Sequence, residues 1–287
     1  MNSMRRLQTL VAVLLTTTLM GLPAGAQPFG DTDVPFVITP DNVTLEMLKL
    51  AKVGPKDYVI DLGSGDGRIV IEGARRFGAR GLGVEIMPDL VRLSNANARA
   101  AGVADRATFR EQDLFKTDLS AATVITMYLL PEVNLQLRPA LLALKPGTRL
   151  VSHDWDMGDW QPDQTVTVPA PDKPIGRGKS SRLHLWVVPA QIAGLWCGAA
   201  GLRSFSIELT QSFQSFQGTL RRHVGGQAQA RDLAGRITGP VLQANNGSAA
   251  LLTIKLDGDA LRIIGAQSSL SALCGLSLRR AADGRCS

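Results

Sequence analysis

A short apolar run followed directly by a glycine-rich turn constrains this chain more than any other feature. Residues 58–62 read Tyr-Val-Ile-Asp-Leu, and residues 63–67 read Gly-Ser-Gly-Asp-Gly. An apolar run of this length bounded by glycines predicts a buried strand, and the amphipathic run at 68–77 predicts a helix after the turn. The glycines at 63 and 65 allow a sharp turn and a close backbone approach to a ligand. A strand, glycine loop and helix in this order predict a ligand site at the carboxyl end of the strand.

The chain on either side of this unit alternates between predicted helices and strands as far as residue 189. Apolar periodicity and turn residues predict further helices at 44–52, from Pro88 onward and at 132–144, and further strands at 81–86, 107–112, 123–128, 149–155 and 182–188. Strands that alternate with helices of about 10–15 residues favour a parallel, doubly wound sheet. We therefore expect residues 27–189 to form one α/β domain with a Rossmann-like sheet.

A different pattern begins near residue 190. Short runs in which apolar and polar residues alternate predict strands at 205–210, 219–222, 235–238, 250–256 and 260–264. Turn residues separate them at Gly225-Gly226, Asn246-Gly247 and Asp257-Gly258. We expect residues 190–287 to form a smaller antiparallel β sandwich or open barrel. This half contains three cysteines, Cys197, Cys274 and Cys286. They allow three different single disulfides, and the sequence does not choose among them.

The first 26 residues are predicted to be a secretory signal peptide. Arg5 and Arg6 precede an apolar run at 10–20, and Ala24-Gly25-Ala26 fits an A-x-A cleavage site. The run is too short for a comfortable membrane span, although an uncleaved anchor is the alternative. We expect an exported protein in the periplasm or associated with the envelope.

Composition excludes several other classes of protein. Hydrophobic residues make up 45% of the chain and charged residues 20%, which excludes a disordered chain and a charge-rich coiled coil. The 31 Lys and Arg exceed the 25 Asp and Glu by 6, and removal of two arginines with the signal peptide leaves +4. So small a positive charge is weak support for a nucleic-acid partner.

Acidic residues near the ends of the predicted strands indicate the kind of ligand. Arg68 stands where a dinucleotide fingerprint has its third glycine, which argues against a dehydrogenase. Asp61 and Asp66 suit a ligand with an ammonium group and hydroxyls better than a pyrophosphate. Glu85 ends the second predicted strand, where we expect it to be partly exposed and to accept hydrogen bonds from two ribose hydroxyls. Asp113 follows the third strand, where an adenine amino group can donate to it.

With this loop and these acids, residues 34–189 resemble the class I, seven-strand S-adenosylmethionine-dependent methyltransferases. Residues 34–40, 61–70, 113–116 and 160–163 are also similar to one protein-lysine methyltransferase family, whose mitochondrial members modify the ATP synthase c-subunit and the adenine nucleotide translocase. The resemblance implies S-adenosyl-L-methionine as the cofactor and a lysine side chain of a protein as the acceptor. It implies cofactor binding by these residues: Phe36, Thr39, Asp61, Gly63, Ser64, Gly65, Asp66, Glu85, Asp113 and Leu114.

Phe36 and Thr39 have a second interpretation. In such enzymes the segment before the first helix folds over the methionine end of the cofactor, so the two residues would line that pocket. A buried aromatic residue followed by a helix-capping turn explains them equally well.

Polar residues at the ends of the fourth and fifth predicted strands are candidates for the acceptor side. Methyl transfer from a sulfonium is an in-line displacement, so the enzyme mainly aligns the two reactants, and a lysine must first lose its proton. The candidates are Tyr128, Glu132, His153, Asp154 and Asp156. Tyr128 can hold an ammonium against its ring, whereas His153 suits a structural role as well as a catalytic one. No metal site is expected, because the run at 153–156 lacks a third clear ligand.

Two features are at odds, because the cofactor is made in the cytoplasm and the signal peptide directs the chain outward. One hypothesis is an exported methyltransferase that acts on a protein amine, with lysine favoured. The other is an exported nucleoside-ligand-binding or interaction module with a non-catalytic methyltransferase fold. The absence of an Asn/Asp-Pro-Pro-Tyr run argues against nucleic acid as the acceptor.

Overall fold

The computed structural model describes residues 36–174, 178–200, 203–224, 227–246 and 249–286. The predicted signal peptide and the glycines of two predicted turns, Gly225-Gly226 and Gly247, lie outside these residues. Within them, no helix is both long and apolar enough to cross a membrane.

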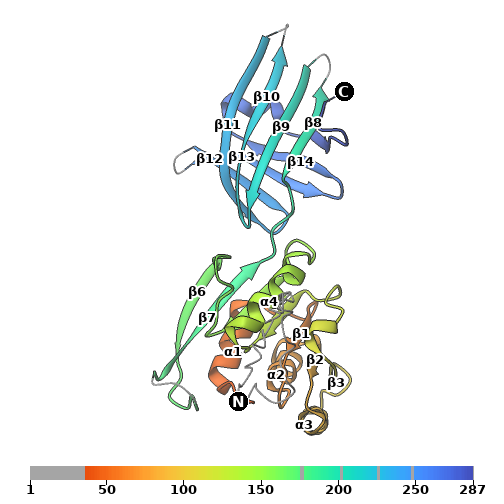
Figure 1. Cartoon of the computed structure of the whole chain (residues 1–287), viewed down its shortest axis with the longest axis vertical. Helices are drawn as coiled ribbons and strands as arrows, with labels where there is room; N and C mark the ends of the chain where they lie inside the picture. Colours follow the sequence, from red (N-terminus) through yellow and green to blue (C-terminus); the bar gives the residue numbers. More distant parts are fainter. Residues whose placement is uncertain (1–35, 175–177, 201–202, 225–226, 247–248, 287) are drawn as a thin grey trace, which may run out of the picture. The chain divides into compact units, whose positions relative to one another are not determined.

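A seven-stranded sheet is formed by the first half of the described chain (Figure 1). Its strands lie in the order β3-β2-β1-β4-β5-β7-β6, with these bounds: β1 (Tyr58–Leu62), β2 (Arg80–Glu85), β3 (Ala107–Glu111), β4 (Val124–Met127), β5 (Arg149–His153), β6 (Gln164–Pro169) and β7 (Ser180–Val187). β1 to β5 run parallel, as predicted. The predicted doubly wound, Rossmann-like sheet is confirmed.

The expectation of a wholly parallel sheet was wrong at one edge. β7 pairs antiparallel with β5, and β6, which was not predicted, pairs antiparallel with β7. A parallel connection needs a crossover of a dozen or more residues, usually through a helix. No helix occurs between Asp154 and Val187 in the described residues, so the chain turns back instead.

Helices cover both faces of the sheet: α1 (Asp41–Leu50), α2 (Arg68–Phe77), α3 (Pro88–Ala100) and α4 (Pro131–Leu142). Successive side chains of a strand point to opposite faces. In β4, Val124 therefore packs with residues of α1 and α2, while Ile125 and Met127 pack with residues of α4. The same alternation directs Thr126 and its register partner Asp61 toward the face of α1 and α2. Two polar side chains thus come together at the carboxyl ends of β1 and β4.

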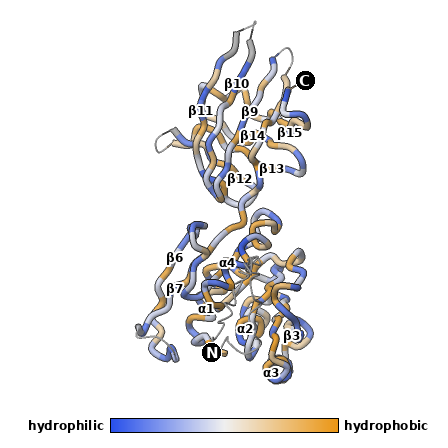
Figure 2. The backbone as a smooth tube through the Cα atoms, viewed as in Figure 1, coloured by the Kyte–Doolittle hydropathy of each residue, from blue (hydrophilic) through white to orange (hydrophobic). Residues whose placement is uncertain are grey.

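A closed barrel of antiparallel strands is formed by the second half. Its strands are β8 (Gly194–Ala200), β9 (Arg203–Ser212), β10 (Ser215–Val224), β11 (Gln227–Thr238), β12 (Val241–Asn246), β13 (Ala249–Asp257), β14 (Ala260–Ala266) and β15 (Ser277–Arg280). Along β9, Phe205, Ile207 and Leu209 are buried, whereas Glu208 and Thr210 are exposed; Figure 2 shows apolar and polar residues mixed along the barrel strands. The predicted antiparallel β structure is confirmed, and its form is a closed barrel rather than a sandwich or an open barrel.

One disulfide joins Cys197 in β8 to Cys286 near the end of the chain, and Cys274 is exposed without a disulfide. β8 meets β15 through only two register pairs, Cys197 with Arg279 and Trp196 with Arg280. The disulfide therefore reinforces the place where the barrel closes. The sheet ends at Val187 and the barrel begins at Gly194, and we propose that the boundary between two domains lies at 189–190.

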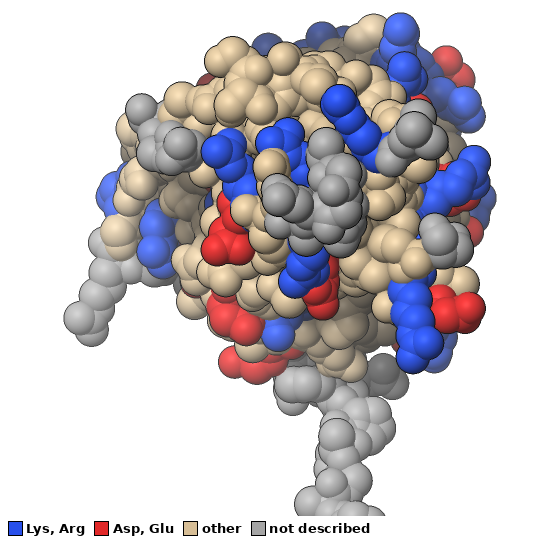
Figure 3. Space-filling view, turned by 90° about the horizontal axis from the view of Figure 1, so that it is seen from above, with Lys and Arg blue, Asp and Glu red and all other residues tan. Residues whose placement is uncertain are grey.

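On the face of the molecule seen in Figure 3, Lys and Arg side chains are interspersed with Asp and Glu. Some oppositely charged side chains of the barrel form ion pairs, for example Arg221 with Glu208 at 3.0 Å and Arg279 with Asp259 at 2.9 Å. All four side chains are more than 40% exposed, so each pair contributes little to stability. This face presents mixed charge instead of one continuous basic area.

Candidate functional site

The loop between β1 and α2 has the conformation that its glycines predict. Gly63, Gly65 and Gly67 all have positive φ, at 71°, 52° and 83°. The positive φ of Gly65 favours glycine there, and a Cβ atom at this position would displace the ring of Phe36. Ser64 is buried, and its hydroxyl finds no hydrogen-bond partner among the described residues. The loop thus presents a polar surface next to the N-terminus of α2.

Asp61 lies beneath this loop at the end of β1. It is 2% exposed, and the Thr126 hydroxyl donates to its Oδ1 at 2.6 Å. Burial raises its pKa to about 7, with smaller contributions from the nearby carboxylates of Asp66 and Glu85, while the Thr126 hydrogen bond acts in the opposite direction. A ligand with a positive charge would stabilise the ionised form of Asp61.

Glu85 is more enclosed than expected. The residue is 8% exposed, because backbone N–H groups surround its carboxylate. Gly65 donates to Oε2 at 3.0 Å, and Ile86 and Met87 donate to Oε1 at 2.8 and 3.0 Å. The expectation of partial exposure was therefore wrong. Within the described part of the chain Oε2 accepts a single hydrogen bond, which leaves it acceptor capacity for a ligand hydroxyl.

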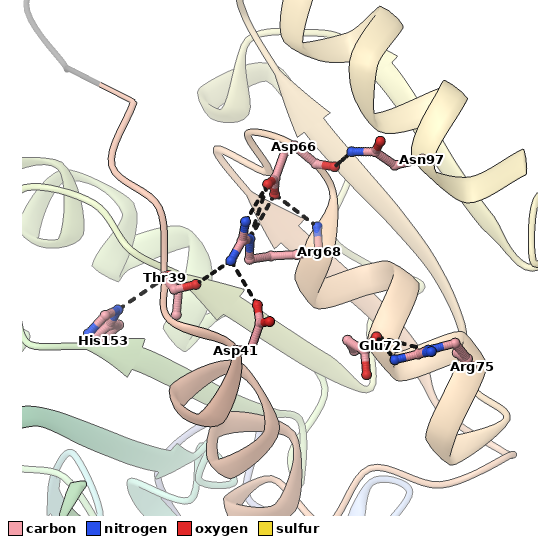
Figure 4. A network of polar contacts seen from close by, with 8 residues as sticks. All are labelled: Thr39, Asp41, Asp66, Arg68, Glu72, Arg75, Asn97 and His153. Atoms are coloured by element: carbon pink, nitrogen blue, oxygen red, sulfur yellow. Dashed lines mark hydrogen bonds and ion pairs between the residues drawn. The ribbon is translucent and has the colours of Figure 1, made fainter. Parts of the chain in front are cut away.

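Arg68 organises the entrance to the loop, as Figure 4 shows. Its guanidinium group holds the Asp66 carboxylate through two parallel hydrogen bonds, from Nε to Oδ1 at 3.0 Å and from Nη2 to Oδ2 at 2.7 Å. Nη1 donates to the carbonyl of Thr39 and to Asp41 Oδ1, both at 2.9 Å. The sequence analysis noted Arg68 only as the residue in the place of a third glycine. The Asp66-Gly67-Arg68 spacing was the sequence signal that could have indicated the ion pair. Asp66, predicted to bind a cofactor, is engaged by Arg68.

The segment before α1 bridges the glycine loop and the end of β5. Phe36 is 42% exposed, with its ring over Gly65. Thr39 is buried; its carbonyl accepts from Arg68, and its hydroxyl lies 3.3 Å from His153 Nδ1 (Figure 4). Phe36 therefore lies against the loop, and Thr39 is joined to the start of the helix that follows it; their part in a cofactor pocket stays a prediction.

His153 and Tyr128 form the acceptor-side cluster at the ends of β4 and β5. Their rings stack with centroids 3.9 Å apart. His153 is fully buried, and its Nε2 lies 2.8 Å from the Ser181 hydroxyl. Burial holds the pKa of His153 well below its usual range, so the ring is neutral near pH 7. Both ring nitrogens of His153 lie within hydrogen-bond distance of a hydroxyl, so the ring is fixed in place. It thereby helps to position Tyr128 and Thr39.

Asp154 follows His153 with a left-handed backbone, at φ 64°. The backbone N–H of Arg182 donates to its Oδ1 at 3.0 Å, and Lys173 Nζ lies 2.6 Å from its Oδ2. Tyr128 lies near the same carboxylate; burial, followed by the charge of Asp154, raises the pKa of Tyr128 to about 12. The structure thus brings Tyr128, His153 and Asp154 together, and adds Lys173 and Ser181, which the sequence did not indicate.

The remaining predicted residues lie apart from this cluster. Glu132 is exposed in the first turn of α4, and within the described residues no hydrogen bond joins it to the others. Asp156 is exposed and accepts from the backbone of Gly158 at 3.0 Å. Asp113 caps the short 3-10 helix η1 (Leu114–Lys116) by accepting from Phe115 N at 2.9 Å, and Leu114 is partly buried against the core. Asp113 and Leu114 lie just beyond β3, at the same sheet edge as Glu85.

Comparisons with known proteins match this chain to a methyltransferase family. The family model of the ANTKMT methyltransferase domain matches residues 61–164. A protein-lysine N-methyltransferase of Saccharolobus islandicus is 45% identical over 137 residues, which cover 47% of this chain and 85% of the relative. A lysine N-methyltransferase of Mus musculus, named for the ATP synthase c-subunit, is 30% identical over 203 residues, 67% of this chain and 81% of the relative. A solved structure of an RNA methyltransferase from Salinibacter ruber in complex with S-adenosyl-L-homocysteine is 52% identical, with a TM-score of 0.49, and the match covers 54% of this chain and 96% of that chain.

Proposed function

Starting from the fact that this chain belongs to the S-adenosylmethionine-dependent methyltransferases with an ANTKMT methyltransferase domain, we propose that it methylates a lysine side chain of a protein. The observation that carries the proposal is the 45% identity to a protein-lysine N-methyltransferase over 85% of that relative. Two further relatives from Mus musculus bear lysine N-methyltransferase names. The cluster at the ends of β4 and β5, in which Tyr128 stacks on His153 near Asp154, supports the proposal, because it offers an amine an aromatic ring and a carboxylate.

The residues around the glycine loop fit S-adenosyl-L-methionine. A cationic ligand would compensate the buried carboxylate of Asp61, and Ser64 has an unpartnered hydroxyl within the described part of the loop. Glu85 Oε2 keeps acceptor capacity for a ribose hydroxyl. Phe36 and Thr39 would cover the site from the side of α1. When bound, the cofactor supplies a methyl group on a positively charged sulfur.

The protein's own contribution is mainly alignment, which can supply several kcal/mol. Because its pKa is raised to about 12, Tyr128 keeps its proton near pH 7 and presents a neutral ring with a polar hydroxyl. His153 is neutral and held by Thr39 and Ser181, so it fixes the orientation of Tyr128. We propose that Tyr128 and Asp154 orient the acceptor amine, and that Glu132, which is exposed, contributes less.

We also propose that the mature chain acts outside the cytoplasm, in the periplasm or at the envelope. The predicted signal peptide at 1–26 supports this location. The disulfide between Cys197 and Cys286 is a second support, because disulfides persist in oxidising compartments. Cell fractionation tests the proposal. A mature N-terminus near Gln27 in the envelope or periplasmic fraction is expected, and full-length chain confined to the cytoplasm would contradict it.

The experiment that tests methyl transfer uses the mature chain and methyl-labelled S-adenosyl-L-methionine. Three acceptors are offered in parallel: a lysine-rich peptide, envelope proteins and total RNA. We expect label in the two protein samples, with mass spectrometry placing the methyl group on a lysine Nζ. The matched control is Glu85→Gln, which keeps the shape of the side chain and should lose most of the incorporation.

Label confined to RNA would contradict the proposal. Tight binding of S-adenosyl-L-homocysteine without label in any sample would instead support a non-catalytic binding module. Calorimetry with S-adenosyl-L-homocysteine, run on the same preparation, separates these outcomes from an inactive sample.

A further inference from the structure

Lys173 lies in the connection between β6 and β7 with its amino group turned into the acceptor-side cluster. Its Nζ is 2.6 Å from Asp154 Oδ2 and donates to the carbonyl of Ser180 at 3.0 Å. Only 11% of the side chain is exposed. Lysines in surface connections usually extend into water and are seldom buried unless they are paired. The Asp154 carboxylate and the Ser180 carbonyl therefore form a site that binds a primary ammonium group.

This binding place adjoins the predicted cofactor site through a continuous series of contacts. Asp154, which holds Lys173, has its Oδ2 3.6 Å from His153 Nε2, and the His153 ring stacks on that of Tyr128. His153 contacts Thr39, and the Thr39 carbonyl accepts from Arg68 at the end of the glycine loop (Figure 4). The ammonium of Lys173 is thus linked to the glycine loop through Asp154, His153 and Thr39.

The chemistry of the site suits an ammonium group. The Asp154 carboxylate and the Ser180 carbonyl are acceptors for its N–H donors, and the Tyr128 phenol lies near the same carboxylate. Asp154 has a left-handed backbone, which is unusual for a residue other than glycine, and the Arg182 N–H holds its Oδ1. His153 is the further titratable group here, with Nε2 3.6 Å from Asp154 Oδ2.

We propose that Asp154, Tyr128 and the Ser180 carbonyl form the subsite for the acceptor ammonium, and that Lys173 occupies it as an internal competitor. An incoming lysine displaces Lys173 and takes over its contacts with Asp154. The inference rests on the proposed lysine methylation, and it names the residues that bind the acceptor. A competitor that fills the subsite nine-tenths of the time weakens the apparent affinity for the acceptor about tenfold.

The test compares Lys173→Met with Lys179→Met in the mature chain. Lys179 is an exposed lysine in the same connection, so it controls for the loss of one positive charge. With the lysine-rich peptide as acceptor, we expect Lys173→Met to lower KM about five- to tenfold. Lys179→Met should leave KM within about twofold of wild type. The affinity for S-adenosyl-L-homocysteine should be the same in all three proteins.

A double-mutant cycle with Asp154→Asn makes the test specific for the subsite. Asparagine tolerates the left-handed backbone and keeps the shape of the side chain while removing its charge. We expect Asp154→Asn to raise KM for the peptide about tenfold, because a charge-assisted contact is lost. Adding Lys173→Met to Asp154→Asn should then lower KM by less than about twofold.

Two results would overturn the inference alone: an unchanged or higher KM in Lys173→Met that melts like wild type, or an equal fall in Lys179→Met. The proposed function has failed as well if the wild-type chain transfers no methyl to the peptide. Should Lys173→Met not fold, Lys173→Gln removes the same charge and takes its place.

Discussion

Asp61 shows how one buried carboxylate can couple proton binding, stability and ligand binding. It is almost completely enclosed, and the Thr126 hydroxyl donates a hydrogen bond to it. The unfolded chain ionises this group near 3.8, whereas the folded chain ionises it at about 7. Between these values the folded state holds an extra proton, so its stability falls as the pH rises through them.

A pH series with Asp61→Asn tests this coupling. Without ligand, we expect the wild-type melting temperature to fall between pH 5 and pH 7.5, and Asp61→Asn to melt about 5 °C higher than wild type at pH 7.5. S-adenosyl-L-homocysteine should stabilise wild type more at pH 7.5 than at pH 5. Differential scanning fluorimetry measures these melting temperatures. The unfolding transition to follow is the one that S-adenosyl-L-homocysteine shifts. Equal pH slopes in the two proteins would show that Asp61 is not the titrating group.

Side chains that belong to a local pattern could be predicted from the sequence, whereas contacts between residues distant in sequence could not. Asp61 and Glu85 come at strand ends and lie beside the glycine loop. Lys173 and Ser181 contact Asp154 and His153 only because β7 folds back beside β5. No sequence spacing shows such a contact before the antiparallel pairing is known.

At the scale of elements, the apolar content of a segment decided whether its helix or strand could be predicted from the sequence. β1 and α2 have the predicted bounds, because an apolar run and glycines mark their ends. β6 reads Gln-Thr-Val-Thr-Val-Pro and is mostly exposed, so it carries little apolar signal. β8 is rich in glycine and alanine, and β15 has only four residues. α1 begins at Asp41 instead of Thr44, because the Pro40 carbonyl accepts from Thr44 and completes its first turn.

Arg68 joins the segment before α1 to the glycine loop through its hydrogen bonds to Thr39 and Asp66. We expect Arg68→Ala to weaken binding of S-adenosyl-L-homocysteine about tenfold, which corresponds to roughly 1.4 kcal/mol. Arg68→Lys should recover only part of this loss, because an ammonium cannot reproduce the paired hydrogen bonds to Asp66. Calorimetry gives the affinities.

Arg75→Ala is the matched control, since Arg75 lies on the same helix, is half exposed and pairs with Glu72. Wild-type affinity in Arg68→Ala, or an equal loss in Arg75→Ala, would show that the connection does not support the site.

At the scale of the whole molecule, the chain builds separate hydrophobic cores. The barrel core includes Trp196, Ile207 and Ile254, and it shares no buried residue with the three clusters around the sheet. The sequence predicted two halves because the pattern of apolar residues changes near residue 190. It did not predict that the barrel closes, since closure depends on pairing β8 with β15, which lie far apart in the sequence.

The disulfide gives a prediction at this scale. Replacing Cys197 and Cys286 together by serine should destabilise the barrel by about 2–5 kcal/mol, because it releases a loop that spans 89 residues. Cys274→Ser should have no such effect, since Cys274 is exposed and forms no disulfide. Calorimetric unfolding with and without reductant measures the change. A barrel transition that neither reductant nor the double replacement lowers would contradict the prediction.

The pairing of the barrel strands leaves one edge open to other chains. Over the described residues each barrel strand has a neighbour on both sides, but β11 pairs with β12 only at Gly235–Thr238. Residues 227–234 of β11 pair with β10 alone, so their outward N–H and C=O groups form a free strand edge. This edge is where a peptide, or a second copy of the chain, can add as a further strand.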